Sequence, residues 1–235
     1  MNIHYHGHSC IQITEGPHSI IIDPYITENP IAVTTLDQIQ VQHILLTHGH
    51  FDHITDAIPL AKQNNATIIA PEELTLFLAK DGVATEALHI GGSWEFPFGR
   101  VFFTPAQHAS SAITEDGQLI YTGSPVGIIL QMGGFTLYHA GDTGLFTDMR
   151  WLGERFAIDV AFLPIGGRFT MGPEDAGIAA EWLNARCVVP IHYDTFPPIS
   201  QDAAAFVQAL EAKGIHGRHM QPGDSFAPER SLVEK

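Results

Sequence analysis

Short apolar runs of strand length recur along this chain, and most of them end in polar residues. Residues 11–13 and 19–22 flank a glycine-proline turn, and residues 126–130 and 135–138 flank a pair of glycines, so each pair predicts a hairpin. An aspartate follows each hairpin closely, which is a weak sign of an internal repeat. Further runs predict single strands at residues 41–46, 67–70, 100–104, 160–163 and 187–191.

Three segments carry the start and stop signals of helices. Residues 71–80 open with proline and two glutamates and are ended by Gly82, and residues 173 to about 185 open with a similar Pro-Glu-Asp sequence. Residues 200–213 form the third segment, which Gly214 ends. The early strands form a meander, whereas later strands alternate with helices. This order predicts an α/β (α+β) fold of two mixed sheets with helices on their outer faces.

Length and composition predict one domain over residues 1–235, since 45% hydrophobic residues are enough for a sizeable core. The chain begins without a basic segment followed by an apolar one, so a secretory signal is not expected. No apolar run is long enough to span a bilayer. We interpret Cys10 and Cys187 as reduced, buried thiols. These features predict a cytoplasmic protein without a membrane partner.

The net charge of −15 limits the partners, because 11 Lys and Arg stand against 26 Asp and Glu. Nucleic-acid binding needs a positive surface that displaces counterions from phosphates, so we expect no nucleic-acid partner. A small anionic substrate held by one or two arginines remains compatible with this charge. Arg168 is the candidate clamp, because a guanidinium matches carboxylate or phosphate geometry. An exposed loop arginine is the alternative.

A dense group of metal-binding side chains follows the predicted strand at residues 41–46. The sequence reads His-x-His-x-Asp-His at His48, His50, Asp52 and His53. Imidazole nitrogens and carboxylate oxygens suit zinc, manganese or iron. Because such side chains gain little from packing at a strand end, the run predicts a metal site.

Three more polar residues follow other predicted strands, namely His108, Asp142 and His192. Loops at one edge of a sheet scaffold converge, so these side chains are expected to join the run at residues 48–53. Seven ligands are what two metal ions need if each keeps an open position for water. Asp142 is the natural bridge, since a carboxylate can bind two cations at once.

Taken together, these motifs resemble the metallo-β-lactamase superfamily. They occur in the family's order as Ile22-Asp23-Pro24, the run at residues 48–53, Pro105-Ala106-Gln107-His108, Ala140-Gly141-Asp142-Thr143 and Pro190-Ile191-His192-Tyr193. The resemblance implies an αββα sandwich. It implies one metal held by His48, His50 and His108, a second held by Asp52, His53 and His192, and Asp142 as the bridge. It also implies that Asp23 orients the ligands from behind.

More narrowly, the chain is similar to the uncharacterised metal-dependent hydrolases grouped near the ascorbate-6-phosphate lactonases. The matching segments are residues 5–9, 23–24, 138–143, 164–166 and 169–176. That family often has Asp-Asn where this chain has Gly167-Arg168, a difference that could alter substrate choice. His6 and His8 could reach the site from the N-terminal strand, and structural histidines are the alternative. Relatives often associate, so a homo-oligomer is compatible with the sequence.

The ligand set predicts a hydrolase. Two divalent ions, zinc first with manganese or iron as alternatives, would share a hydroxide as nucleophile, and Asp52 would aim it. We expect an ester or lactone of a small, anionic or phosphorylated molecule as substrate. A small-molecule phosphodiesterase or a thioesterase with the same metal site is the alternative. Di-iron proteins rank lower, since such relatives typically carry Glu in place of His50 together with a flavin domain. A non-catalytic metal-binding protein is the alternative of another class.

Overall fold

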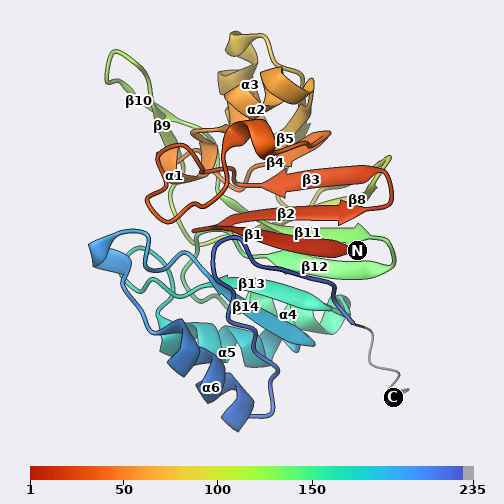
Figure 1. Cartoon of the computed structure of the whole chain (residues 1–235), viewed down its shortest axis with the longest axis vertical. Helices are drawn as coiled ribbons and strands as arrows, with labels where there is room; N and C mark the ends of the chain where they lie inside the picture. Colours follow the sequence, from red (N-terminus) through yellow and green to blue (C-terminus); the bar gives the residue numbers. More distant parts are fainter. Residues whose placement is uncertain (230–235) are drawn as a thin grey trace.

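Two mixed β-sheets lie face to face at the centre of the molecule, and helices cover their outer faces (Figure 1). The computed structural model describes residues 1–229. One sheet has the strand order β15-β1-β2-β3-β4-β5-β6, and the other has the order β14-β13-β12-β11-β8-β7. The predicted fold class, a sandwich of two mixed sheets flanked by helices, is therefore confirmed.

The two sheets are built to the same plan. Each contains an antiparallel hairpin, β2-β3 or β11-β12, followed by parallel strands, which are β4, β5 and β6 in the first sheet and β13 and β14 in the second. The first sheet consists of β1 (Asn2–Gly7), β2 (Cys10–Glu15), β3 (His18–Ile22), β4 (His43–Leu45), β5 (Thr67–Pro71), β6 (Thr85–Leu88) and β15 (Ser225–Phe226). The second consists of β7 (Ser93–Phe96), β8 (Gly99–Pro105), β11 (Val126–Met132), β12 (Phe135–His139), β13 (Val160–Pro164) and β14 (Cys187–Ile191). A separate hairpin is formed by β9 (Ser111–Ile113) and β10 (Leu119–Tyr121).

The helices connect the parallel strands and cover the sheets. Helices α2 and α3 contact the first sheet, and α5 and α6 contact the second. The α-helices are α1 (Phe51–Ile54), α2 (Ala57–Asn64), α3 (Glu72–Leu78), α4 (Asp148–Arg155), α5 (Pro173–Leu183) and α6 (Ala203–Ala212). Short 3₁₀ turns lie at Leu36–Gln38, Ala79–Asp81 and Pro197–Ile199. No helix in residues 1–229 combines the length and the apolar character that crossing a membrane requires.

Three of these helices match the predicted segments, with corrected ends. Helix α5 stops at Leu183, because Asn184 takes a left-handed conformation. Helix α6 begins at Ala203 rather than at residue 200, because Asp202 caps it by accepting a hydrogen bond from Ala205. The sequence analysis did not predict α1, α2, α4, the strands β6, β7 and β15, or the β9-β10 hairpin. Strands β6 and β7 lie at sheet edges and expose part of their side chains, so their hydrophobic pattern is weak.

Alternate residues of one strand enter different cores. On β3, Ile20 and Ile22 belong to the core between the two sheets, which also contains Phe162, whereas Ile21 belongs to a second core that contains Leu60 of α2. This is the expected consequence of the two-residue period of a strand. Full burial of such a side chain contributes about 1.5–3 kcal/mol. The sheets therefore form a rigid support for the loops at their edges.

Candidate metal centre

The seven predicted ligands converge at one edge of the sandwich. His48 and His50 follow β4, and Asp52 and His53 lie in the short helix α1. The other three come from the second sheet, where His108 follows β8, Asp142 follows β12 and His192 follows β14. Together with an eighth residue, His8, they form three groups within which all ligand atoms lie within 4.8 Å of one another: His48, His50 and His108; His8, Asp52, His53 and His192; and His48, His53 and Asp142.

The first group consists of three imidazoles whose nitrogens point at one another. His48 Nε2 lies 3.0 Å from His50 Nδ1, and His108 Nε2 lies 3.3 Å from the same His50 atom. Tetrahedral zinc with nitrogen ligands at about 2.0–2.1 Å would place those nitrogens about 3.3 Å apart. The spacing therefore fits one ion. We call this set, His48, His50 and His108, the three-histidine group.

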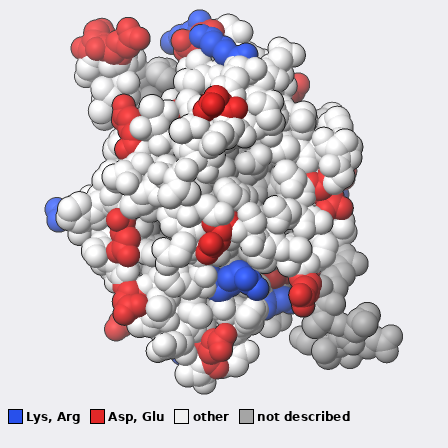
Figure 2. All heavy atoms as spheres, viewed as in Figure 1, with Lys and Arg blue, Asp and Glu red and all other residues white. Residues whose placement is uncertain are grey.

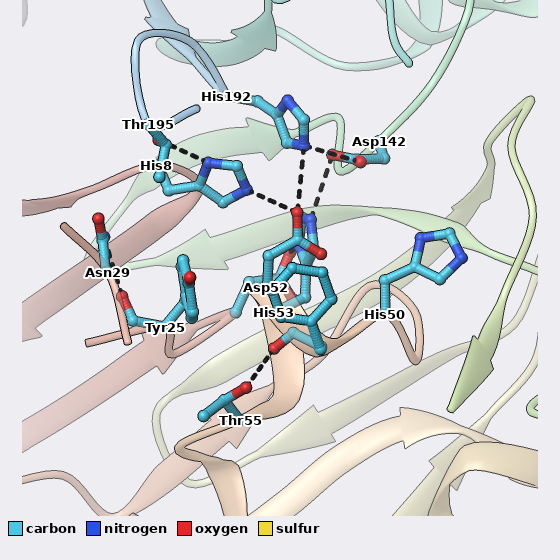
Figure 3. A network of polar contacts seen from close by, with 12 residues as sticks. His8, Tyr25, Asn29, His50, Asp52, His53, Thr55, Asp142, His192 and Thr195 are labelled. Atoms are coloured by element: carbon cyan, nitrogen blue, oxygen red, sulfur yellow. Dashed lines mark hydrogen bonds and ion pairs between the residues drawn. The ribbon is translucent and has the colours of Figure 1, made fainter. Parts of the chain in front are cut away.

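The Asp142 carboxylate faces His192 and His53 (Figure 3), and it also lies near His108 of the three-histidine group. Its Oδ2 is 3.0 Å from His192 Nε2 and 3.5 Å from His108 Nε2, and its Oδ1 is 3.4 Å from His53 Nε2. The carboxylate thus faces nitrogens of both halves at once. This is the position that a bridging ligand would occupy.

Buried polar atoms without partners mark the centre of the cluster. Within residues 1–229, His53 Nε2, His192 Nε2 and Asp142 Oδ1 are buried and have no hydrogen-bond partner. Buried polar atoms in native proteins are almost always hydrogen-bonded, so such a concentration calls for an explanation. Cations between these atoms would satisfy all three, with His53 releasing the proton that, despite burial, Asp142 and Asp23 favour by raising its pKa. The donors present therefore fit divalent metal ions.

Burial and neighbouring charges prepare these groups for metal binding. Burial lowers the pKa of His48, His50 and His108, and neighbouring histidines lower it further, so these imidazoles are neutral at pH 7. Burial opposes ionisation of Asp142, but His192 and His53 outweigh it and hold the pKa of that carboxyl well below its usual range. Neutral imidazoles and ionised carboxylates are the forms that coordinate metals.

Asp23 holds the ligands from behind. The carboxylate is fully buried, and its Oδ2 accepts hydrogen bonds from Thr47 Oγ1 at 2.7 Å and from His53 Nδ1 at 2.8 Å. The Thr47 hydroxyl in turn lies 3.0 Å from His48 Nδ1. Asp23 therefore orients His53 directly and His48 through Thr47. This geometry supports the orienting role expected for Asp23.

His8 belongs to the cluster, although β1 ends one residue before it. Its Nδ1 lies 2.8 Å from Thr195 Oγ1, and its Nε2 lies 3.2 Å from Asp52 Oδ2 (Figure 3). Burial lowers the pKa of His8 to about 4, even though Asp52 raises it. The backbone carbonyl of His8 also accepts a hydrogen bond from the His192 amide. By contrast, His6 points away from the cluster and bonds Gln12.

Arg168, the predicted anion clamp, and His139, which precedes the Asp142 loop, do not enter these groups. Arg168 is exposed, and its guanidinium lies 5.6 Å from the ring centre of Phe169, so its role as an anion clamp stays a prediction. His139 is buried, and its Nε2 donates to the carbonyl of Ser9 while its Nδ1 accepts from the Gly141 amide. His139 thus supports the loop that carries Asp142.

An aromatic wall borders the cluster on the side of His8 and Asp52. It consists of Tyr25, Phe51 and Phe196, whose ring centres are 6.0–6.3 Å apart. Phe51 is 57% exposed and Phe196 is partly exposed, so the wall faces solvent next to the ligands. The sequence analysis missed this wall and Thr195. Phe51 lies inside the ligand run, but no local pattern links it to Tyr25 or Phe196.

Comparison with known proteins identifies the family. Residues 18–193 match the domain described as the β-lactamase superfamily domain. A UPF0173 metal-dependent hydrolase of Geobacillus thermodenitrificans is 54% identical over 226 residues, which cover 96% of this chain and 99% of that protein. Another from Anoxybacillus flavithermus is 52% identical with the same coverage.

Solved structures agree with the sequence relatives. A novel metallo hydrolase from the hyperthermophilic archaeon Ignicoccus hospitalis is 37% identical, with a TM-score of 0.87 and coverage of 96% of this chain and 97% of that one. The isothiocyanate hydrolase from Delia radicum gut bacteria is 19% identical and shares the fold, with a TM-score of 0.77 over 97% and 99% of the two chains. The chain therefore belongs to the β-lactamase superfamily and, within it, to the metal-dependent hydrolases named UPF0173.

Proposed function

We propose that this protein is a dinuclear metal-dependent hydrolase that opens an ester or lactone of a small molecule. The observation that carries the proposal is the position of Asp142 between the three-histidine group and the pair His53 and His192, whose buried Nε2 atoms have no hydrogen-bond partner within residues 1–229. The names of the close relatives support the hydrolase class. Partial exposure of His50, His108 and Asp52 supports catalysis over a purely structural metal site, because a substrate can reach these residues.

When bound, two divalent ions lower the pKa of a coordinated water to about 7 and polarise the bond under attack. The Asp52 carboxylate lies at the open side of the cluster, with 14% of its side chain exposed. Burial disfavours its ionised form, but hydrogen bonding to His8 and the charge of His53 lower its pKa below the usual range. Asp52 can therefore accept a hydrogen bond from the attacking water and aim it. Asp23 and Thr47 keep the imidazoles of His53 and His48 in place during the reaction.

The surroundings of the cluster favour a small substrate with an apolar part. The aromatic wall offers ring faces beside Asp52, where an acyl chain or a lactone ring could pack. Acidic side chains are distributed over the face shown in Figure 2, and they outnumber Lys and Arg in the sequence. This charge disfavours polynucleotides as substrates.

We further propose zinc as the metal and the cytoplasm as the location. Imidazole and carboxylate donors without thiolates are typical of catalytic zinc, with manganese and iron as alternatives that the same donors accept. Cys10 and Cys187 are free, buried thiols, which is typical of a reducing compartment.

Parallel assays on lactones, carboxylic esters, thioesters and small phosphodiesters test the substrate class. The hydrolysis rate is measured for the chelated protein and for the protein loaded with zinc or with manganese. We expect metal-dependent opening of lactones or esters. In the His50→Ala variant we expect a loss of about 100-fold or more, since one polarising contact is worth several kcal/mol. Cleavage of phosphodiesters alone would replace the proposal with the phosphodiesterase alternative. Lactone hydrolysis that survives complete chelation would refute the metal mechanism.

A further inference from the structure

His8 is held in the same way as His48. In both residues Nδ1 faces a threonine hydroxyl, at 2.8 Å from Thr195 for His8 and at 3.0 Å from Thr47 for His48. In both residues Nε2 faces the cluster. Histidines that bind metals usually donate their second ring N–H to a fixed partner in this manner, which sets the tautomer.

The hydroxyl protons decide which ring nitrogen carries hydrogen. Thr47 Oγ1 donates to Asp23 Oδ2, and Thr195 Oγ1 donates to the carbonyl oxygen of Tyr193. A hydroxyl has one proton, so a threonine that donates to one of these oxygens accepts from the histidine Nδ1–H. For Thr195 this is the arrangement in which His8 Nε2 is free to bind a metal. A neutral imidazole then carries a lone pair on Nε2. The Nε2 lone pairs of His48 and His8 both point into the cluster.

The lone pair of His8 therefore meets a carboxylate oxygen. His8 Nε2 is 3.2 Å from Asp52 Oδ2, so in this tautomer a cation between the two acceptors would be bound by both, whereas in the metal-free protein the same contact is a hydrogen bond from His8 Nε2–H to Asp52. The separation is close to the spacing of about 3.3 Å between neighbouring ligands of tetrahedral zinc. Ligand atoms of His53 and His192 lie within 4.8 Å of these two atoms.

We propose that His8 is a fourth protein ligand of the ion held by Asp52, His53 and His192. The inference rests on the proposed metal centre, in which the two ion positions would then differ in the number of their protein ligands and in their exposure to solvent. His8 and His53 are fully buried and His192 is 2% exposed, so protein donors enclose this half of the cluster, and only Asp52 keeps an exposed edge, with 14% of its side chain accessible. The three-histidine group has one donor fewer, and His50 and His108 are partly exposed. Closed zinc sites are typically structural, whereas catalytic sites keep an open position. The water and the substrate therefore reach the ion of the three-histidine group.

Metal binding by three matched variants tests the assignment. His8→Gln removes the imidazole, Thr195→Val removes only the hydroxyl behind it, and His6→Gln is the control. His6 lies two residues earlier and is equally buried, but it contacts Gln12 instead of the cluster. Metal content after gel filtration, zinc affinity by competition with a chelator, and the absorption spectrum of the cobalt-loaded protein are measured for each.

We expect the wild type and His6→Gln to hold two ions with equal affinity. His8→Gln should weaken one of the two sites by more than the roughly 10–100-fold that loss of an outer hydrogen-bond partner costs, and should change the cobalt spectrum. The zinc affinity of Thr195→Val should lie between that of the wild type and that of His8→Gln. Two ions bound by His8→Gln with wild-type affinity and spectrum would overturn the role of His8 and leave the proposed function intact. Failure of the wild type to bind metal would instead overturn the proposed function.

Long-range proton–nitrogen NMR of the wild-type protein tests the same point without a substitution. We expect His8 Nδ1 to be protonated, and its Nε2 signal to shift on loading with zinc as the Nε2 signal of His48 does. A protonated Nε2 in the zinc-loaded protein would show that His8 donates to Asp52 and would overturn the assignment.

Discussion

Three histidines of the cluster are anchored by oxygen atoms behind them. Asp23 accepts from His53, Thr47 lies behind His48, and Thr195 lies behind His8. His8 and Asp23 also adopt positive φ angles of 56° and 48°, which are unfavourable for residues with a side chain. Such conformations cost of order 1–3 kcal/mol and persist where the surrounding structure holds them. The cluster is thus preorganised at the expense of local backbone strain.

Asp23→Asn should weaken metal binding without removing a ligand. The substitution leaves an amide where His53 Nδ1–H and two Thr47 donors need acceptors, so both ligands lose part of their orientation. We expect a loss of about 10–100-fold in zinc affinity, measured by chelator competition. Asp159→Asn is the matched control, because Asp159 is also buried and accepts from a backbone amide, that of Thr136, but precedes β13. Equal losses in the two variants would show a general effect on stability.

His6 should make the metal-free protein sensitive to acid. Burial lowers its pKa from 6.5 to about 4, so the unfolded chain binds a proton at a higher pH than the folded chain does. The contribution of His6 to the free energy of unfolding is therefore complete above pH 6.5 and is lost as the pH falls toward 4. Between pH 7 and pH 5 the wild type should lose about 2 kcal/mol more than His6→Gln. Urea unfolding of both proteins at the two pH values measures this difference, and parallel losses would contradict it.

The turns at the strand ends bring the ligands together. The β11-β12 hairpin leads to Gly141, which has a φ of 62° and lies against Thr47 and the carbonyl of Val126. A Cβ atom at Gly141 would come within 2.9 Å of both neighbours. Because Thr47 supports His48, this close approach connects the loop of one sheet with the loop of the other. The glycine before Asp142 is therefore a packing requirement as well as a conformational one.

Gly141→Ala should disturb the metal centre more than an equivalent change elsewhere. We expect it to lower both the free energy of unfolding, by about 1–3 kcal/mol, and the zinc affinity, since Thr47 and Asp142 must move apart. Gly16→Ala is the control, since Gly16 has a φ of 55° but nothing within 4 Å of an added Cβ. Chemical unfolding and zinc titration of both variants separate the steric clash from the cost of the positive φ. Equal effects at the two positions would show that the contact with Thr47 is unimportant.

Loops of the two sheets meet at the metal centre. Loops that follow strands of the first sheet contribute His8 and the ligands at residues 48–53, whereas the second sheet contributes His108, Asp142 and His192. Ions bound there would cross-link the two sheets at one edge. Without them, ionised and lone-pair atoms of both sheets would face one another across that edge.

Chelation should therefore lower the stability of the entire sandwich. A ligand that binds only the folded state at 100 times its dissociation constant contributes about 2.7 kcal/mol, and two ions contribute more. We expect a lower melting temperature and faster hydrogen exchange at residues 46–53 and 140–143 after metal removal. Calorimetry and hydrogen exchange with and without chelator measure both effects. Unchanged melting and exchange would mean that no ion links the sheets.

Much of the sandwich and most of the cluster could be predicted from local patterns. A buried strand ends, and ligands follow it, at residues 48–53, at His108, at Asp142 and at His192. The equivalent hairpins ending near Asp23 and Asp142 also proved to be equivalent elements of the two sheets. These signals survive in the sequence because strand periodicity and ligand spacing involve residues that are neighbours along the chain.

Other features depended on contacts between residues distant in sequence. His8 meets Thr195 across 187 positions, and the ring of Phe196 meets Tyr25 because the loop after β14 packs against the loop after β3. Nothing near these residues in the sequence records such contacts, because the pairing of strands and the packing of the two sheets decide them. For the same reason the sequence alone did not distinguish His6 from His8 as the residue that reaches the cluster. The turn after β1 sends His8 into the cluster and leaves His6 on the outer face. Residues two positions apart on a strand would share a face, so the left-handed conformations of Gly7 (φ 107°) and His8 (φ 56°) redirect the chain between them.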